Sequence, residues 1–314
     1  MKASIIVPTR GGARRLPTLL ASLAAQTHHD WEAIVVIDGD IDESEAVVRR
    51  YAHLPIRSVV FPENRGRAAA LNVGLAAASG DVLIRADDDF ELDPGHLSAH
   101  VQCHEASECG VIGLPRNIAP PTRYMRVYGL DADGRGREHA YQSAPDARWR
   151  LWGGNVSISR ESYERIGGYD TRYRGYGWED VDYGYRLQQA GIPIVLAQGA
   201  EVLHHVASTT TAIRALRAFD SGAARWTFDT IHGIGASGPA EPEAFSPWNR
   251  TVVGLSRWLT RRRSDIIARC VDGTIHVLPS AIARRTVGMV VEASSVAGYR
   301  SARDADDANG VPRG

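Results

Sequence analysis

Four short apolar segments, each followed by polar residues, recur in the first 90 residues of the chain. Three of them are Ala3–Val7, Ala33–Ile37 and Ile56–Phe61, and the fourth begins at Val82. Helical patterns lie between them, most clearly in the alanine-rich segment Ala68–Ala77. Strands that are apolar throughout and alternate with helices favour a parallel sheet that is buried on both faces. We therefore predict an α/β fold with a mostly parallel, Rossmann-like central sheet and helices on both faces.

Polar residues follow the apolar segments at the points where the predicted strands end. In α/β sheets of this kind, ligands bind in the crevice at the carboxyl ends of the strands. Side chains that are scattered in the sequence would therefore meet in one crevice. These residues are Thr9 and Arg10, Asp38, Asn64 and Arg65, and Asp87 to Asp89.

Asp87, Asp88 and Asp89 form an acidic cluster directly after the fourth apolar segment. Adjacent carboxylates repel each other, and a bound Mg²⁺ or Mn²⁺ would remove that conflict because these cations prefer oxygen ligands. The alternative is a solvated acidic turn that caps the next helix at Asp93 and Pro94. The convergence of the polar strand ends favours the metal site. No GxGxxG follows the first strand and no GxxxxGK[ST] occurs, so bound phosphates would need a metal or arginines.

Composition narrows the class of protein further. The formal net charge of −1 over 314 residues gives no indication of a nucleic-acid partner. The three cysteines, Cys103, Cys109 and Cys270, show no CxxC spacing and fit a reducing compartment. The N-terminus shows no signal-peptide pattern, and no apolar run approaches the roughly 20 residues that span a bilayer. We therefore expect a soluble, cytoplasmic protein.

The second half of the chain carries weaker patterns. The segment Asp131–Arg137 predicts a mobile polar loop, because it combines glycines with charged residues. Helices are predicted to begin near Glu179 and to span Ala212–Phe228 and Val252–Arg269. From Asp304 onward the composition predicts a disordered tail. Together these patterns predict a C-terminal helical extension.

An amphipathic basic cluster lies within that extension. Trp258 and Leu259 stand beside Arg261, Arg262 and Arg263. Such a cluster is typical of a solvated helix face or helix end. Peripheral contact with a membrane through this basic segment is the alternative.

A series of short motifs follows a fixed order along the first two-thirds of the chain. They are Val7-Pro8-Thr9-Arg10, Ile37-Asp38, Glu63-Asn64-Arg65-Gly66, Ser79-Gly80-Asp81, Asp87-Asp88-Asp89, Gly153-Gly154-Asn155 and Gly177-Trp178-Glu179-Asp180. In their order and spacing, the chain resembles the family 2 glycosyltransferases of the GT-A fold from about Ala3 to Ser208. The last motif resembles the branch that includes chondroitin-type polymerases and β-1,4-galactosyltransferases.

Two motifs depart from the pattern of that family. Asp38-Gly39-Asp40 stands in place of the usual Asp-Asp-Gly-Ser and is one residue shorter. Gly177-Trp178-Glu179-Asp180 is a compressed form of Trp-Gly-Gly-Glu-Asp. The first departure concerns the nucleobase contact of Asp38, and the second concerns the shape of the acceptor pocket.

The resemblance implies a metal-dependent, inverting glycosyltransferase that moves a sugar from a UDP-sugar donor to a hydroxyl acceptor with Mn²⁺ or Mg²⁺ as cofactor. The acceptor would be a glycan, a glycolipid or a small natural product. Residues 1–115 would form the nucleotide-sugar-binding half and residues 116–209 the acceptor-binding and catalytic half of one GT-A domain. Residues 210–314 would form the helical extension with its tail.

The resemblance also implies roles for individual residues. Asp180 would be the catalytic base, and Glu179 would bind hydroxyl groups beside it; both could instead only cap a helix. The metal would be held by Asp89 and Asp87 with either His204 or His205, although such a histidine pair is otherwise one core and one surface residue. The nucleotide-sugar-binding residues would be Pro8, Thr9, Arg10, Asp38, Asn64, Arg65, Arg67, Asp87, Asp88, Gly154 and Trp178.

Two other classes of function are alternatives to a glycosyltransferase. A sugar-nucleotide nucleotidyltransferase would need a glycine-rich loop with basic residues after the first strand, and Pro8–Gly12 matches it poorly. A non-catalytic sugar-binding protein would not need Asp87, Asp89, Asp180 and a late histidine together. The modest length favours an enzyme that makes a single transfer over a processive polymerase.

Overall fold

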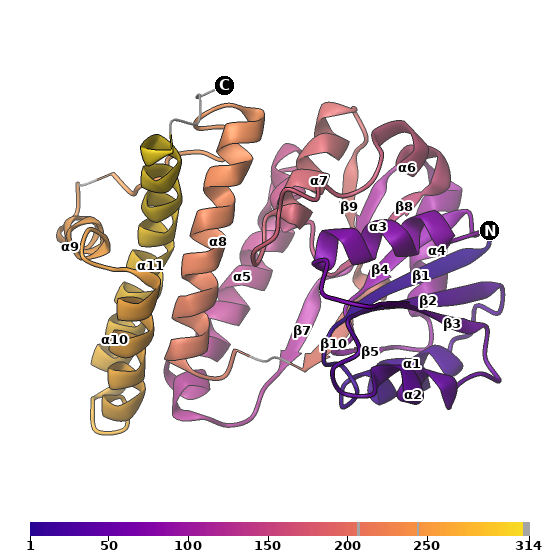
Figure 1. The fold of residues 1–314 in the computed structure, drawn as a ribbon, viewed down its shortest axis with the longest axis horizontal. Helices are drawn as coiled ribbons and strands as arrows, with labels where there is room; N and C mark the ends of the chain where they lie inside the picture. Colours follow the sequence, from indigo (N-terminus) through magenta and orange to yellow (C-terminus); the bar gives the residue numbers. More distant parts are fainter. Residues whose placement is uncertain (206–207, 244, 310–314) are drawn as a thin grey trace. The chain divides into compact units, whose positions relative to one another are not determined.

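A computed structural model describes residues 1–205, 208–243 and 245–309 of the chain (Figure 1). The chain divides into two compact units. The α/β unit consists of Met1–Ile118, Arg137–Arg174 and Glu179–His205. The helical unit consists of Ala119–Gly136, Gly175–Trp178 and Val206–Gly314. The division of the chain into three consecutive functional parts stays a prediction.

A seven-stranded sheet forms the centre of the α/β unit. Its order is β3-β2-β1-β4-β8-β6-β9, and every neighbouring pair is parallel except those made by β8, which is antiparallel to β4 and β6. The predicted α/β fold with a mostly parallel sheet is therefore confirmed. In sheet order, the strands are Ile56–Phe61, Trp31–Asp38, Ala3–Thr9, Val82–Ala86, Asn155–Ser159, Gly110–Ile112 and Ile194–Leu196.

Helices cover both faces of this sheet, which explains why its central strands are apolar throughout. Figure 1 shows α3 on one side of β1 to β3 and the helices α1 and α2 on the other. Alternate residues of β1 face opposite sides: Ile5 and Val7 join the core with α1 and α2, whereas Ile6 faces α3. The helices of this unit are α1 Leu16–Ala24, α2 Ser44–Arg49, α3 Arg67–Ala77, α4 His96–Ala106, α6 Arg160–Ile166 and α7 Glu179–Gln189.

A second, three-stranded sheet in the α/β unit was not predicted from the sequence. Its order is β5-β10-β7, and β10 runs antiparallel to β5 and parallel to β7. The strands are Phe90–Leu92, Val202–His205 and Pro115–Ile118. Short 3₁₀ helices lie at Pro145–Leu151 and Gln198–Ala200. Because β5 follows the acidic cluster and β10 contains His204, this sheet brings the side chain of His204 to Asp89.

The prediction of a mobile loop at Asp131–Arg137 is wrong. These residues lie in α5, a helix that spans Leu130–Gln142 and follows a π-helical turn at Met125–Gly129. Asp131 lies in the first turn, where the helix dipole favours a carboxylate, and it pairs with Arg135 one turn later. These two effects offset part of the cost of the glycines inside the helix.

The helical unit is built around two long, adjacent helices, α8 (Thr211–His232) and α11 (Ser280–Ala308) (Figure 1). Their backbones approach closely: a side chain at Gly298 of α11 would overlap the carbonyl oxygen of Phe219 in α8. Two apolar clusters fill the unit, and both contain residues of α8 and α11. The predicted helical extension is therefore present.

The helix predicted over Val252–Arg269 is interrupted. The structure has two helices there, α9 (Pro247–Ser256) and α10 (Arg261–Thr274). Thr260 ends the interruption, because its hydroxyl oxygen accepts a hydrogen bond from the backbone N–H of Arg263 at 3.3 Å and caps α10.

The prediction of a disordered tail from Asp304 onward is wrong for residues 304–308, because these residues belong to α11, which ends at Ala308. Side-chain contacts tie this end of α11 to α8. The indole N–H of Trp226 donates to Asp306 at 2.6 Å, and the hydroxyl of Tyr299 donates to the buried Asp229 at 2.8 Å. Residues 310–314 of the predicted tail lie outside the described residues.

No helix in the described part of the chain combines the length and the apolar character that crossing a membrane would require.

Three histidines of α4 are buried against the central sheet of the α/β unit. His96, His100 and His104 recur every four residues and so lie on one face of the helix. The Nδ1 of His100 lies 2.8 Å from the hydroxyl of Ser157, and the Nε2 of His104 lies 2.8 Å from the same hydroxyl. Burial lowers the pKa of His96 and of His104 to about 4, and that of His100 well below the ordinary 6.5.

This histidine cluster predicts that the protein loses stability as the pH falls from 6.5 toward 4. The histidines stay neutral in the folded state but bind protons in the unfolded state, so the unfolded state gains protons over this range. Each histidine then adds up to about 1.4 kcal/mol per pH unit to the loss. Urea unfolding at pH 7.5 and pH 5.5 measures it. His104→Gln should reduce the slope, whereas the exposed His29→Gln should not; equal slopes in both variants would contradict the prediction.

Candidate active site

Asp88, the middle residue of the acidic cluster, binds residues at and after the end of β1. Both carboxylate oxygens of Asp88 are occupied: one accepts from the hydroxyl of Thr9, and the guanidinium of Arg15 donates to both at 2.8 Å. Asp88 is buried. The structure therefore directs Asp88 toward the protein, where it orders the end of β1 at Pro8 and Thr9 and the exposed Arg10 that follows it.

Asp38, at the end of β2, shapes the turn that leads into α3. Its two carboxylate oxygens accept the backbone N–H groups of Arg65 at 2.6 Å and Gly66 at 2.9 Å. The side chains of Asn64, Arg65 and Arg67 are exposed at this turn. These three residues and Arg10 thus present polar groups at the carboxyl ends of β1 and β3, as the sequence predicted for a sheet of this kind.

Arg85 of β4 connects two carboxylates that lie far apart in the sequence. Its guanidinium donates to Asp87 through Nε at 3.2 Å and through Nη2 at 3.0 Å, and to Asp180 through Nη1. Arg85 is only 3% exposed, and its guanidinium also lies 5.8 Å from the ring centre of Tyr169. One buried cation therefore orients a carboxylate of the acidic cluster and the predicted base together.

The charge state of Asp87 reflects this environment. Burial would raise the pKa of Asp87, but the guanidinium groups of Arg85 and Arg67 outweigh it and hold the pKa below its ordinary value. Gly154 lies directly against the same carboxylate, where a Cβ atom would contact the Asp87 oxygens, and its carbonyl accepts the backbone N–H of Asp87 at 3.2 Å. The glycine at position 154 is thus required for the close approach of β8 to the acidic cluster.

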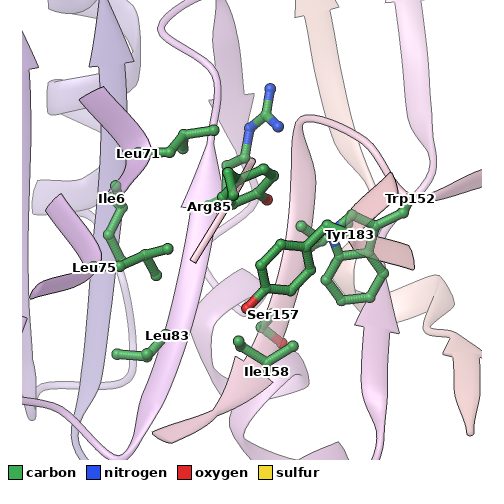
Figure 2. A pocket seen from close by; sticks show the side chains of 11 residues that line it. Ile6, Leu71, Leu75, Leu83, Arg85, Trp152, Ser157, Ile158 and Tyr183 are labelled. Carbon is green, nitrogen blue, oxygen red and sulfur yellow. The ribbon is translucent and has the colours of Figure 1, made fainter. Parts of the chain in front are cut away.

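A small apolar cavity lies beneath Arg85. Figure 2 shows Leu71, Leu75 and Leu83 on one side and Trp152, Ile158 and Tyr183 on the other, with the guanidinium of Arg85 directed away. Its volume of about 10 Å³ is room for roughly one water molecule. This cavity is too small for a sugar, so a donor would bind above Arg85 at the strand ends and not inside it.

Asp89 and His204 approach each other between β5 and β10. The Oδ2 of Asp89 lies 3.3 Å from the Nε2 of His204, and the Nδ1 of His204 lies 2.7 Å from the Oδ1 of Asn117. His205 points elsewhere: its ring is 3.1 Å from Glu91, and its side chain is 46% exposed. Of the two histidines that the sequence left open, the structure brings His204 to the acidic cluster.

Two ligating atoms in adjacent positions around one cation, each at about 2.1 Å, lie about 3 Å apart. The separation of Asp89 and His204 fits such a pair. Within residues 1–205, 208–243 and 245–309, no three His, Cys, Asp or Glu side chains are grouped closely enough to hold a metal by themselves. The donor set therefore suits a cation that also takes oxygens from water or a phosphate.

Glu179 and Asp180 begin α7. Glu179 is 2% exposed; its Oε1 lies 3.4 Å from Arg67, and its Oε2 has no hydrogen-bond partner in the described part of the chain. A buried carboxylate oxygen without a partner is costly and indicates that a donor from outside the protein can complete it. Asp180 has one oxygen, Oδ1, occupied by Arg85.

Trp178 belongs to the helical unit. Its φ angle of +68° is rare for a residue with a side chain, its indole N–H donates to Ser221 at 3.2 Å, and its ring lies 5.1 Å from that of Phe228. Trp178 is partly buried by these contacts. Its role in binding the nucleotide sugar stays a prediction.

Sequence reasoning missed Arg85, Asn117 and Tyr169 as site residues. Arg85 had a signal: a charged residue inside a strand that is otherwise buried needs a buried partner. Asn117 and Tyr169 had none, because their partners lie far away in the sequence.

A known protein-family model matches more than half of the chain. Residues 4–167 match the model described as glycosyl transferase family 2, and residues 137–208 match the model of the N-terminal domain of galactosyltransferase.

Relatives with a curated description are similar over a comparable region. The validoxylamine A glucosyltransferase of Streptomyces hygroscopicus subsp. jinggangensis (strain 5008) is 29% identical over 234 residues, which covers 64% of this chain and 55% of the relative. The glucosyl-dolichyl phosphate glucuronosyltransferase of Haloferax volcanii is 29% identical over 185 residues, covering 54% and 56%. The chain thus spans about half the length of these curated relatives.

Solved structures share the fold at low identity. The mannosyltransferase PcManGT from Pyrobaculum calidifontis, in complex with GDP-Man and Mn²⁺, gives a TM-score of 0.63 at 19% identity and covers 96% of this chain and 87% of its own. S. aureus TarS 1-349 in complex with UDP-GlcNAc gives 0.51 at 13% identity, covering 99% and 92%. With its family match over residues 4–167, this chain belongs to glycosyl transferase family 2.

Proposed function

We propose that this protein is a metal-dependent, inverting glycosyltransferase that transfers a sugar from a UDP-sugar to a hydroxyl-bearing acceptor. The observation that carries the proposal is the chain of contacts from Asp180 through Arg85 to Asp87, next to Asp89 and His204. The carboxylate that would accept the proton of the acceptor hydroxyl is thus linked through Arg85 to the acidic cluster that would hold the cation. Complexes of similar proteins with GDP-Man and with UDP-GlcNAc support a nucleotide-sugar donor.

Asp89 and His204 would hold the cation, and the residues around them fit that role. If Nδ1 of His204 carries the proton, it donates to Asn117 and leaves the lone pair of Nε2 directed toward Asp89. A bound Mn²⁺ or Mg²⁺ would offset the negative charge that develops on the diphosphate as it leaves. The exposed Arg10, Arg65 and Arg67 would bind diphosphate oxygens or the base.

Asp180 would accept the proton of the attacking acceptor hydroxyl. Because Oδ1 is held by Arg85, Oδ2 is the atom that would face the hydroxyl. Glu179 would accept a hydrogen bond from a sugar hydroxyl through its unpartnered Oε2. A single displacement by the acceptor reverses the configuration at the anomeric carbon, so the proposed enzyme inverts that configuration.

The proposed acceptor is a molecule that carries a hydroxyl group. The relatives are named for validoxylamine A, glucosyl-dolichyl phosphate and hyaluronan, which are chemically unlike one another. A panel of UDP- and GDP-sugars, with release of the nucleoside diphosphate as the signal, tests the proposal. Release that depends on a UDP-sugar and stops with EDTA is the expected result; release unaffected by EDTA would contradict the metal dependence.

Removing the imidazole of His204 should weaken the response to metal. His204→Ala is expected to raise the Mn²⁺ concentration for half-maximal release of UDP by at least about 10-fold, since a ligand is lost. His205→Ala is the matched control, because its ring faces Glu91 and not Asp89. A larger shift in His205→Ala than in His204→Ala would reverse the assignment.

A further inference from the structure

Another pocket lies entirely within the helical unit, and none of the site residues named so far lines it. Its volume of about 410 Å³ is in the range of small-molecule sites. The C-terminal end of α9 and the last turns of α11 line it. The lining residues are Ser256, Arg257, Leu259, Ala297, Arg300, Ser301, Arg303 and Asp304.

The sequence of α11 places one polar face toward this pocket. Ala297, Arg300, Ser301 and Asp304 recur at intervals of three and four residues, so they share a side of the helix. Leu259 and Ala297 are buried and contribute apolar surface. The pocket thus combines a small apolar base with polar groups, as ligand pockets commonly do.

Positive charge exceeds negative charge at this pocket. Three guanidinium groups line it, from Arg257, Arg300 and Arg303, against the single carboxylate of Asp304. Outside the lining, Glu241 accepts from the Nε of Arg300 at 2.6 Å. The guanidinium groups therefore outnumber the carboxylates by one even when Glu241 is included.

The arginines keep donors that no residue in the described part of the chain uses. Arg303 donates Nε and Nη2 to one oxygen of Asp304, at 3.0 and 2.9 Å, which leaves Nη1. Arg300 uses Nε for Glu241, which leaves its terminal nitrogens. Arg257 makes no direct side-chain hydrogen bond or ion pair among the described residues, although its charge acts on Glu241 at longer range.

We propose that this pocket binds the phosphate or diphosphate group of a ligand. Planar guanidinium groups match phosphate oxygens in pairs, and a phosphate offers more acceptors to converging donors than a carboxylate does. The hydroxyl of Ser301 is a further donor at the rim. The site shares no residue with the donor site, so the proposal stands whether or not the protein transfers sugars.

Two sources could supply this phosphate chemistry. One is a soluble phosphorylated compound, and the other is the headgroup of an anionic phospholipid. The second source is included because Trp258, next to Arg257, is 73% exposed and Arg262 and Arg263 are exposed nearby in the sequence.

Calorimetric titration of the full chain with inorganic phosphate and pyrophosphate tests the first source. EDTA is present and nucleotide is absent, so that the donor site contributes no metal-dependent binding. The double variant Arg257→Gln/Arg303→Gln should bind at least about 10-fold more weakly than the unmodified chain. Arg49→Gln/Arg269→Gln removes the same charge from two exposed i,i+4 pairs outside the pocket and should bind normally.

Sedimentation with phosphatidylcholine vesicles, with and without phosphatidic acid, tests the second source. Sedimentation of the protein with the vesicles that needs phosphatidic acid, and that is lost in the pocket variant but not in the control variant, supports a lipid headgroup. Weaker binding of phosphate or pyrophosphate by the pocket variant in the calorimetric titration supports a soluble ligand. Thermal melting verifies that both variants are folded. No binding in either experiment, or equal binding by pocket and control variants in both, overturns the proposal.

Discussion

Replacing Asp180 with asparagine should lower the rate of sugar transfer by about 10²–10⁴-fold while binding of the UDP-sugar survives. Asparagine keeps the shape of the side chain and can still accept a hydrogen bond from Arg85, which contacts Asp180 in the structure. It cannot take a proton from the acceptor hydroxyl at neutral pH. The loss should therefore appear in turnover and not in donor affinity.

Two measurements separate these effects. Calorimetry with the donor and Mn²⁺ reports binding, and product formation reports turnover. Asp146→Asn removes an exposed carboxylate from the same unit and should leave both unchanged. Transfer by Asp180→Asn at the rate of the unmodified protein would rule out Asp180 as the base. Proton NMR of the product should show inverted anomeric configuration, and retention would contradict a single displacement.

Replacing Arg85 with glutamine should impair both stability and activity. Arg85 is buried and shared by Asp87 and Asp180, whose side chains are 27% and 14% exposed. Without the guanidinium, two carboxylates face each other with no cation between them. Breaking a buried pair costs about 3–5 kcal/mol, and the lower end applies here because both carboxylates reach solvent. Urea unfolding should therefore show a loss of about 3 kcal/mol.

A double-mutant cycle identifies the cause of that loss. Arg85→Gln combined with Asp180→Asn removes one of the two unpaired carboxylates, so the combined variant should be more stable than the sum of the single effects. Arg85→Lys keeps the charge but cannot donate to both carboxylates in the same geometry, and it should rescue stability only in part. Additive effects in the cycle would show that Arg85 and Asp180 are not coupled in solution.

Local patterns were enough to predict the main architecture. The first four strands lie within two residues of the apolar segments, and α3 was predicted to one residue. Burial on both faces makes these strands continuously apolar, which is a signal carried by neighbouring residues alone. The polar residues at their ends follow from the same topology, because parallel strands end at the same edge of the sheet.

Other elements were missed because their stabilising partners are distant. The two glycines of α5 led to the prediction of a loop, but contacts such as that of Arg137 with Glu201 at 2.7 Å stabilise the helix. The end of α11 reads as a tail, yet Trp226 of α8 binds Asp306. In each case the energy that decides the conformation comes from side chains that are 64 or more residues away.

The acidic cluster shows the same division at the site. The sequence by itself determined that Asp87, Asp88 and Asp89 follow a buried strand in a family 2 glycosyltransferase chain. Only the tertiary structure decided that Asp88 turns toward Arg15, that Asp87 shares Arg85 with Asp180, and that Asp89 meets His204 instead of His205. The order of residues specifies which strand a side chain follows, whereas the pairing of strands and the burial of one arginine determine which charge it faces.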